Sequence, residues 1–283
     1  MDVKACARLT RPVNSVMVGF AVVVGVFIAA GVEKVTIEPL SVLAGFAAGT
    51  LIAAAAMVLN DIVDIDIDRV NEPGRPLPSG RVTIRQAYAC FAALSIAGLL
   101  AAAWTGVPTL AVAAAAWLLA VVYDTWGKRS GLPGNLMVAA ATSIPFVYAM
   151  ALLRCMCGEM LVFWAIVFLT VLAREVAKDI ADVEGDRLGG ARTLPILVGE
   201  AKAARVAALL YIAAVALSPL PLLEGKINPL TYTPLVAIVD AILVYESARI
   251  MRTQDRETIL EHKRNVLIAM LIGLLAFLAG SVA

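Results

Sequence analysis

Nine long runs of apolar residues alternate with short polar segments along the chain. Each run can cross the apolar core of a bilayer as a helix, which takes about 17 to 25 residues. Because backbone polar groups in lipid must be satisfied within their own segment, the runs should be α-helices. The pattern predicts an all-α, polytopic membrane protein that forms one integral membrane domain over residues 1–283. The nine predicted helices cover roughly residues 13–32, 40–60, 84–105, 108–124, 135–153, 160–178, 203–223, 229–248 and 265–282.

The basic residues are distributed unequally between the two sides of this predicted bundle. The segments on one side contain only Lys34, Arg154 and Lys226, so the other side holds 20 of the 23 Lys and Arg residues (23 minus 3). Lys and Arg are enriched in cytoplasmic segments. The asymmetry therefore predicts a multi-pass protein of the cell membrane, with its N-terminus in the cytoplasm and its C-terminus outside.

Composition agrees with this fold class. Hydrophobic residues make up 61% of the chain and charged residues only 16%, whereas about a quarter of a typical soluble domain is charged. Nothing in the sequence indicates a nucleic-acid partner, and membrane lipids are the expected surroundings. The four cysteines are expected to be ordinary small residues, because the Cys155–Cys157 pair has poor geometry for a disulfide and is a poor metal site alone.

Two copies of the acidic pattern D-x-x-D-x-x-x-D end the second and sixth predicted helices. The first copy consists of Asp61, Asp64 and Asp68, and the second of Asp179, Asp182 and Asp186. Carboxylates with this spacing on one continuous helix share a face, where they repel one another and also oppose the helix dipole. A divalent cation such as Mg²⁺, which prefers oxygen ligands, would offset this repulsion.

A second interpretation of each copy is a solvated helix end whose acids form ion pairs with nearby basic residues. Against it, the two copies are related by one constant offset of 118 residues, and each leads into a basic loop containing proline. The shared offset predicts an internal duplication of a helix–loop–helix unit, with both copies on the cytoplasmic side.

Basic residues beside the acids suggest that the second ligand is a polyanion. Arg75, Lys178 and Arg192 accompany the two motifs, and Lys128 follows Tyr123 in another cytoplasmic loop. Such cations suit phosphate oxygens, so a lipid diphosphate at the mouth of an apolar bundle is the expected substrate class. Other basic residues are expected to be plain membrane anchors; these are Arg85, Arg205, Arg249, Arg252 and Arg256.

Several stretches resemble the signatures of the UbiA superfamily of intramembrane prenyltransferases. The N-D-x-x-D-x-x-x-D sequence starting at Asn60 and the D-x-E-G-D sequence starting at Asp182 look like its two acidic motifs. The R-P-x-N sequence starting at Arg11 and the R-P-x-P-S-G sequence starting at Arg75 are similar to its N-terminal and first-loop motifs. The resemblance runs from about residue 8 to the end of the chain.

The resemblance implies a metal-dependent site with assigned residues. It implies that two Mg²⁺ ions hold a prenyl diphosphate through Asn60, Asp64, Asp68, Asp182 and Asp186. Asp61 and Asp179 belong to the repeat but rank second as metal ligands, and they could instead orient the others. The residues expected to bind substrate are Asn14, Arg75, Tyr123, Lys128, Lys178 and Arg192. The family pattern Y-x-x-x-K is not matched in full, because Lys128 lies one residue too far from Tyr123.

Three further stretches resemble the branch of this superfamily that makes digeranylgeranylglyceryl phosphate for ether lipids. They begin at Arg11, Gly131 and Arg174. This branch implies Mg²⁺-dependent transfer of a geranylgeranyl group from its diphosphate to the free hydroxyl of geranylgeranylglyceryl phosphate. Prenylation of an aromatic acceptor such as 4-hydroxybenzoate in quinone biosynthesis is the alternative.

A secondary transporter is a third possibility. Transporters place ionisable residues near the bilayer midplane, whereas most acids here lie at helix ends. Asp240 is the exception and is interpreted as a polar packing residue. His262 is expected in the loop before the last helix and is assigned no role.

Overall fold

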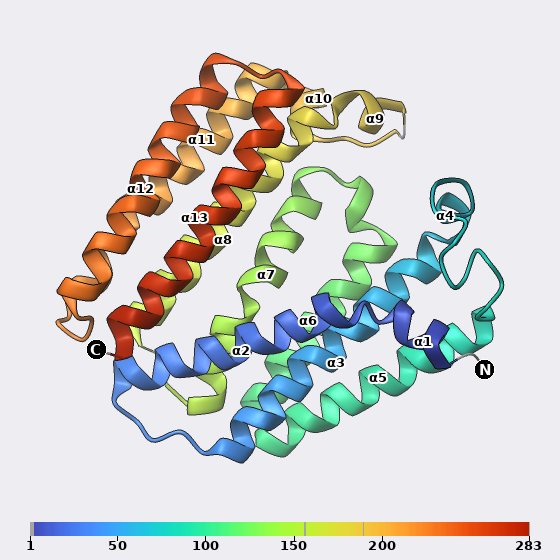
Figure 1. Cartoon of the computed structure of the whole chain (residues 1–283), viewed down its shortest axis with the longest axis horizontal. Helices are drawn as coiled ribbons and strands as arrows, with labels where there is room; N and C mark the ends of the chain where they lie inside the picture. The colour runs from blue at the N-terminus through green and yellow to red at the C-terminus, as the bar shows by residue number, and fades with distance from the viewer. Residues whose placement is uncertain (1–2, 156, 189, 283) are drawn as a thin grey trace. The chain divides into compact units, whose positions relative to one another are not determined.

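The computed structural model describes residues 3–155, 157–188 and 190–282, and within them every predicted apolar run forms a long helix (Figure 1). Eight of these nine helices are long and apolar enough to cross a membrane. The helix not among the eight is α12, which carries Asp240 and Glu246, so a ninth span stays a prediction. The nine are α2 (Pro12–Glu33), α3 (Pro39–Val63), α5 (Ile84–Thr105), α6 (Val107–Thr125), α7 (Leu132–Leu153), α8 (Gly158–Ala181), α11 (Glu200–Leu217), α12 (Pro229–Arg252) and α13 (Arg256–Val282).

Short helices connect the long ones. Four are α-helical, namely α1 (Val3–Leu9), α4 (Ile65–Asn71), α9 (Val183–Leu188) and α10 (Leu194–Val198), and two are 3₁₀ turns, η1 (Gly127–Arg129) and η2 (Leu220–Leu222). The chain divides into two compact units. The first contains residues 1–26, 36–125 and 145–155, and the second contains 27–35, 126–144 and 156–283. Each unit is built from separate stretches of the chain, and the single domain over residues 1–283 stays a prediction.

In the first unit, α3 packs against α5 and α6. A buried cluster joins α1, the end of α3 and the loop before α5; its members include Leu9, Val58, Ile62, Leu77 and Val82. This cluster fixes the loop that follows the first acidic motif. Thr83 then caps α5 through a reciprocal capping box with Gln86, so the helix begins where the sequence predicts it.

In the second unit, α8, α11, α12 and α13 run side by side, as Figure 1 shows. Small residues such as Ala177, Ala203 and Ala207 fill their buried contacts, which lets the helix backbones approach closely. Asp240 accepts a hydrogen bond from Ser218 Oγ at 2.7 Å, which agrees with the predicted packing role.

His262 corrects the prediction for the last helix. Helix α13 begins at Arg256, not near residue 265, so His262 lies inside the helix and is fully buried instead of in a solvated loop. Its ring nitrogens lie 3.0 Å from Tyr211 Oη and 3.1 Å from Glu246 Oε2. Partners on α11 and α12 satisfy this polar side chain, which no local sequence pattern reveals.

Candidate functional site

The two acidic motifs break their helices at the same position. Helix α3 ends at Val63 and α4 begins at Ile65, which leaves Asp64 between them with φ −88° and ψ 7°. Asp182 lies between α8 and α9 with φ −102° and ψ 3°. In each copy the carbonyl of this Asp accepts the first hydrogen bond of the next helix, from Asp68 N at 2.8 Å and from Asp186 N at 2.9 Å.

This shared break corrects one prediction and supports another. The acids of each copy do not lie on one continuous helix, because a second helix starts within each motif. The break occurs in both copies at residues 118 positions apart, as the predicted duplication requires. Polar side chains at such a break are held at the end of one helix and the start of the next, so they can converge on a common ligand.

Two arginines hold the first motif in the first unit. Arg11 Nη2 donates to Asp61 Oδ1 at 2.7 Å, and Arg75 Nη1 donates to Asp68 Oδ2 at 2.6 Å and lies 3.5 Å from Asp61 Oδ1. Asp61 and Asp68 are buried, whereas each arginine side chain keeps a third of its surface exposed. The ion-pair interpretation therefore holds for these two acids, and the exposed guanidinium surface remains able to meet an anion.

Arg75 reaches the motif from the loop between α4 and α5. Burial is the largest single effect and acts to lower the pKa of its guanidinium, but the hydrogen bond to Asp68 and the charges of the nearby carboxylates together raise the pKa above its ordinary value. The side chain therefore stays charged under all ordinary conditions. A fixed positive charge beside two carboxylates suits a site that takes both a metal ion and phosphate.

Asn60 is held by a residue that the sequence analysis missed. Its amide Nδ2 donates to Asp124 Oδ1 at 3.0 Å, and its carbonyl Oδ1 lies 3.4 Å from Arg11 Nη2. Asp124 is buried in the last turn of α6, directly after the half-buried Tyr123. The signal in the sequence that could have identified Asp124 was a lone acid at the end of an apolar run. Asn14, also predicted to bind substrate, is exposed near the start of α2.

The second motif lines a cleft in the second unit. The cleft has a volume of about 640 Å³ and contains five carboxylates, from Asp182, Glu184, Asp186, Glu200 and Asp255. Arg256 also lines it, although the sequence analysis interpreted this residue as a membrane anchor. Burial, and then the charge of Asp182, raise the pKa of the Asp186 carboxyl above its ordinary value. Such a concentration of carboxylates favours a bound cation.

Asp179 is buried and is not among the residues that line this cleft. Its Oδ2 accepts a hydrogen bond from Asn135 Nδ2 at 2.7 Å, so Asp61 and Asp179, which correspond in the repeat, are both buried and bound by side chains of the protein. Lys178 Nζ donates to Glu175 Oε2 at 3.0 Å and keeps 37% of its side chain exposed. Lys128 is half-buried in η1, and Arg192 is exposed.

Close backbone packing joins the loop before α7 to the loop after the second motif. Gly131 has φ +71°, and a Cβ placed there would overlap the carbonyl oxygen of Arg192. A Cβ at Gly134 would overlap the carbonyl oxygen of Gly127. These two contacts explain why residues 131 and 134 are glycine. The hydrogen bond to Asp179 explains why residue 135 is asparagine.

The geometry suits divalent metal and phosphate chemistry. Mg²⁺ prefers carboxylate and amide oxygens and keeps open positions for water or phosphate, and the side chains of Asn60, Asp64, Asp68, Asp182 and Asp186 supply only such oxygens. The basic side chains of each unit are of the kind that suits phosphate oxygens; these are Arg75 in the first unit and Lys128, Lys178, Arg192 and Arg256 in the second. The oxygen donors of each motif, taken by itself, therefore fit Mg²⁺.

Comparison with known proteins identifies a family of membrane prenyltransferases. The model of the UbiA prenyltransferase family matches residues 18–268. Digeranylgeranylglyceryl phosphate synthase of Methanoculleus marisnigri is 38% identical over 88% of this chain and 87% of its own length. The enzyme of the same name from Thermococcus kodakarensis is 35% identical over 99% of both chains.

Solved structures agree. One described as "Structural and mechanistic insights into the biosynthesis of Digeranylgeranylglyceryl phosphate synthase in membranes" is 30% identical and has a TM-score of 0.90, covering 99% of this chain and 98% of that one. A UbiA homologue from Archaeoglobus fulgidus, solved with GPP and Mg²⁺, shares the fold at 16% identity and a TM-score of 0.69, covering 96% of this chain and 99% of its own.

Proposed function

Because the chain belongs to the UbiA prenyltransferase family, we propose that it transfers a geranylgeranyl group from its diphosphate to the free hydroxyl of geranylgeranylglyceryl phosphate. The chain is a multi-pass membrane protein and an intramembrane prenyltransferase. The observation that carries the choice of acceptor is the near full-length similarity to enzymes named digeranylgeranylglyceryl phosphate synthase. The reaction places the protein in the biosynthesis of ether phospholipids.

The two acidic motifs supply the metal ligands of this proposal. We assign that role to Asn60, Asp64, Asp68, Asp182 and Asp186. Bound Mg²⁺ supplies positive charge that stabilises the departing diphosphate. The proposal is supported by the repeated helix break at Asp64 and Asp182 and by the five carboxylates around the second motif.

Asp61 and Asp179 position the neighbouring metal ligands. Asp61 and Asp179, although first considered as ligands, hold Arg11 and Asn135 through short hydrogen bonds. Their role is to fix the ends of α3 and α8 so that the neighbouring ligands are kept in place. Asp124 does the same for Asn60, because its hydrogen bond to the amide nitrogen leaves the carbonyl oxygen facing away from it.

The basic side chains bind phosphate. Arg75, Lys128 and Lys178 contact the diphosphate, and Arg192, Asn14 and Tyr123 complete the binding of the substrates. Arg256, which lines the same cleft as Asp182, suits an acceptor that carries its own phosphate.

The chemical step breaks one bond and forms another. The bond between C1 of the geranylgeranyl group and the diphosphate oxygen breaks, and the electron pair leaves with the diphosphate. The glycerol oxygen then forms an ether bond with C1, and its proton passes to the released diphosphate or to solvent. Charged side chains stabilise the leaving group, and apolar helix faces keep water from competing for C1. We place both motifs on the cytoplasmic side, with the N-terminus in the cytoplasm and the C-terminus outside.

Release of diphosphate tests this proposal. The purified protein in detergent should release diphosphate from geranylgeranyl diphosphate only when Mg²⁺ and geranylgeranylglyceryl phosphate are both present. A chelator should abolish release, and added Mg²⁺ should restore it. Release that continues in the presence of the chelator would refute the metal assignment.

A further inference from the structure

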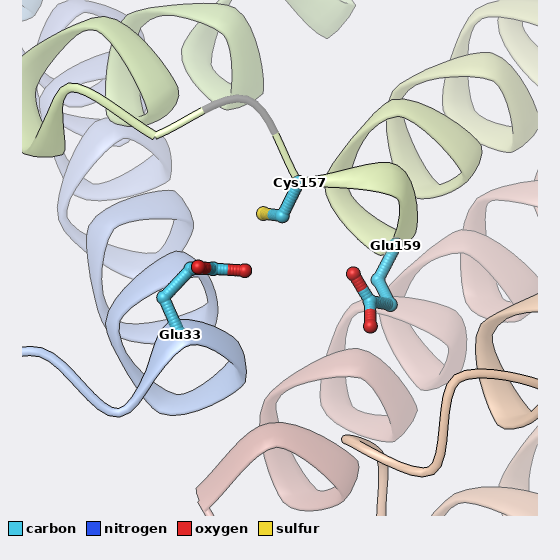
Figure 2. Close-up of side chains that lie close together, drawn as sticks. All are labelled: Glu33, Cys157 and Glu159. Atoms are coloured by element: carbon cyan, nitrogen blue, oxygen red, sulfur yellow. The ribbon is translucent and has the colours of Figure 1, made fainter.

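A second cluster of ligating side chains lies at the opposite end of α8 from Asp182. Glu33 ends α2, Cys157 caps the start of α8, and Glu159 is in its first turn, as Figure 2 shows. One ligand atom of each residue lies within 4.8 Å of the others. Because α8 has 24 residues, about 36 Å of helix separate this cluster from Asp182. It therefore cannot share a ligand with the second motif.

Glu159 points into this cluster from the first turn of α8. The residue is 1% exposed, and neither of its carboxylate oxygens has a hydrogen bond to any residue that the structure describes. Burying a carboxylate without hydrogen bonds costs free energy, because the lost hydration is not replaced. Figure 2 shows its oxygens directed toward the space that Cys157 and Glu33 also face. The side chain therefore indicates a missing electropositive partner.

Lys226 supplies part of the positive charge in this cluster. Its Nζ lies 2.9 Å from Glu33 Oε1 and 3.6 Å from both Glu159 Oε2 and Glu224 Oε2. The ammonium donates its hydrogen bond to Glu33 and not to Glu159. The Glu159 oxygens have no hydrogen bond to this ammonium, so a cation placed between Glu33, Cys157 and Glu159 would stabilise them.

The donor set indicates which cation this is. A cysteine sulfur with two carboxylates is a poor site for Mg²⁺, which prefers oxygen alone, but suits Zn²⁺, which accepts sulfur and oxygen ligands. Cys157 and Glu159 also lie at the N-terminus of α8, where the helix dipole favours negative ligands. Both features favour a thiolate-bound metal.

We propose that Glu33, Cys157 and Glu159 bind a zinc ion that is structural and separate from the transferase site. The Cys157 thiol loses its proton to solvent when the sulfur–metal bond forms, and no redox change is involved. Lys226 then moves toward Glu224, whose side chain is half exposed. The ion links the end of α2 to the start of α8. The sequence alone left Cys157 as an ordinary small residue, because its partner Glu33 comes from a distant part of the chain.

Cobalt substitution gives a direct test. Co²⁺ bound by a thiolate has a sulfur-to-metal charge-transfer absorption in the near ultraviolet, which a site made of carboxylates alone does not give. The wild-type protein, stripped with a chelator and titrated with Co²⁺ in the presence of excess Mg²⁺, should show this absorption at one cobalt per chain. Zinc should then displace the cobalt and remove the absorption.

Matched variants identify the side chains that hold the metal. Cys157→Ser should abolish the charge-transfer absorption, and Glu159→Gln should weaken cobalt binding about tenfold or more. The control variants Cys155→Ser and Asp182→Asn should leave the absorption and the cobalt affinity unchanged. Lys226→Met should tighten cobalt binding, because the competing ammonium is gone. Monodisperse elution of each variant in detergent checks that it is folded.

Two results would overturn the proposal. Absence of the charge-transfer absorption in the wild-type protein would show that Lys226 alone neutralises the cluster. Absorption that persists in Cys157→Ser but disappears in Cys155→Ser would place the metal elsewhere. Neither result bears on prenyl transfer, which is measured separately with Mg²⁺ and both substrates.

Discussion

Asn60 donates a hydrogen bond from its amide nitrogen to the buried carboxylate of Asp124 across 3.0 Å, which joins the end of α3 to the end of α6. The bond fixes the orientation of the Asn60 side-chain amide, so that Nδ2 faces Asp124 and Oδ1 faces away from it. A metal ligand held in this way needs no reorientation when the cation binds, so the proposed metal affinity depends on a residue that need not touch the metal.

Removing Asp124 should therefore weaken the response to Mg²⁺. In Asp124→Ala the amide of Asn60 can rotate, and the Mg²⁺ concentration for half-maximal transfer should rise about 10-fold to 100-fold. Titration of activity with Mg²⁺ measures this. Thr125→Val is the matched control, because Thr125 is exposed and bonds only its own helix backbone in the described structure, and it should behave like wild type. An unchanged Mg²⁺ response in Asp124→Ala would exclude the positioning role.

The equivalence of Asp64 and Asp182 predicts equal sensitivity of the two motifs. Asp64→Asn and Asp182→Asn should each lower the transfer rate by about 100-fold or more, because each removes charge that holds the metal beside the leaving group. Asp66→Asn provides the control, since Asp66 lies between the ligands in sequence but its side chain is 83% exposed and pairs with Arg69. Initial rates with radiolabelled donor give the comparison. Normal turnover in either motif variant would remove that motif from the metal site.

Gly131 should be intolerant of a side chain. Gly131→Ala combines a left-handed backbone with a steric clash against the Arg192 carbonyl, and should cost about 1 to 3 kcal/mol of stability. Thermal unfolding in detergent should show a lower midpoint, and transfer should fall because the loop carrying Arg192 and Thr193 is displaced. Gly74→Ala is the control, because a Cβ there meets no atom within 4 Å. Equal midpoints for the two variants would contradict the close packing.

Arg256 should matter for the acceptor more than for the donor. It lines the cleft of the second motif, and the proposed acceptor carries its own phosphate. Arg256→Ala should raise the KM for geranylgeranylglyceryl phosphate about tenfold while changing the KM for geranylgeranyl diphosphate much less. The exposed Arg252 offers a control, and Arg252→Ala should leave both constants unchanged. If Arg256→Ala alters neither KM, Arg256 is the membrane anchor that the sequence first suggested.

The long helices could be predicted from sequence because each apolar run must satisfy its own backbone in lipid. The short helices α4 and α9 could not, since they have seven and six residues and are polar. The acidic spacing fits an unbroken helix as well as a broken one, so the breaks at Asp64 and Asp182 were missed. The position of His262 was misread for a related reason, because the charged residues at the start of α13 resemble a loop.

The acidic ligands of the candidate site could be proposed from sequence because they are repeated locally, with one offset. Their partners could not, because they come from distant positions. Arg11 and Asp124 lie 50 and 64 residues away from the side chains that they bind, and Asn135 lies 44 residues from Asp179. Spacing within one helix carries no information about such contacts.

The identity of the product tests the central claim most directly. The purified protein should be given radiolabelled geranylgeranyl diphosphate and Mg²⁺ with geranylgeranylglyceryl phosphate and 4-hydroxybenzoate present together, and the labelled products identified by mass spectrometry. Our account predicts one labelled product, the diether digeranylgeranylglyceryl phosphate. Label found only in prenylated 4-hydroxybenzoate would contradict it.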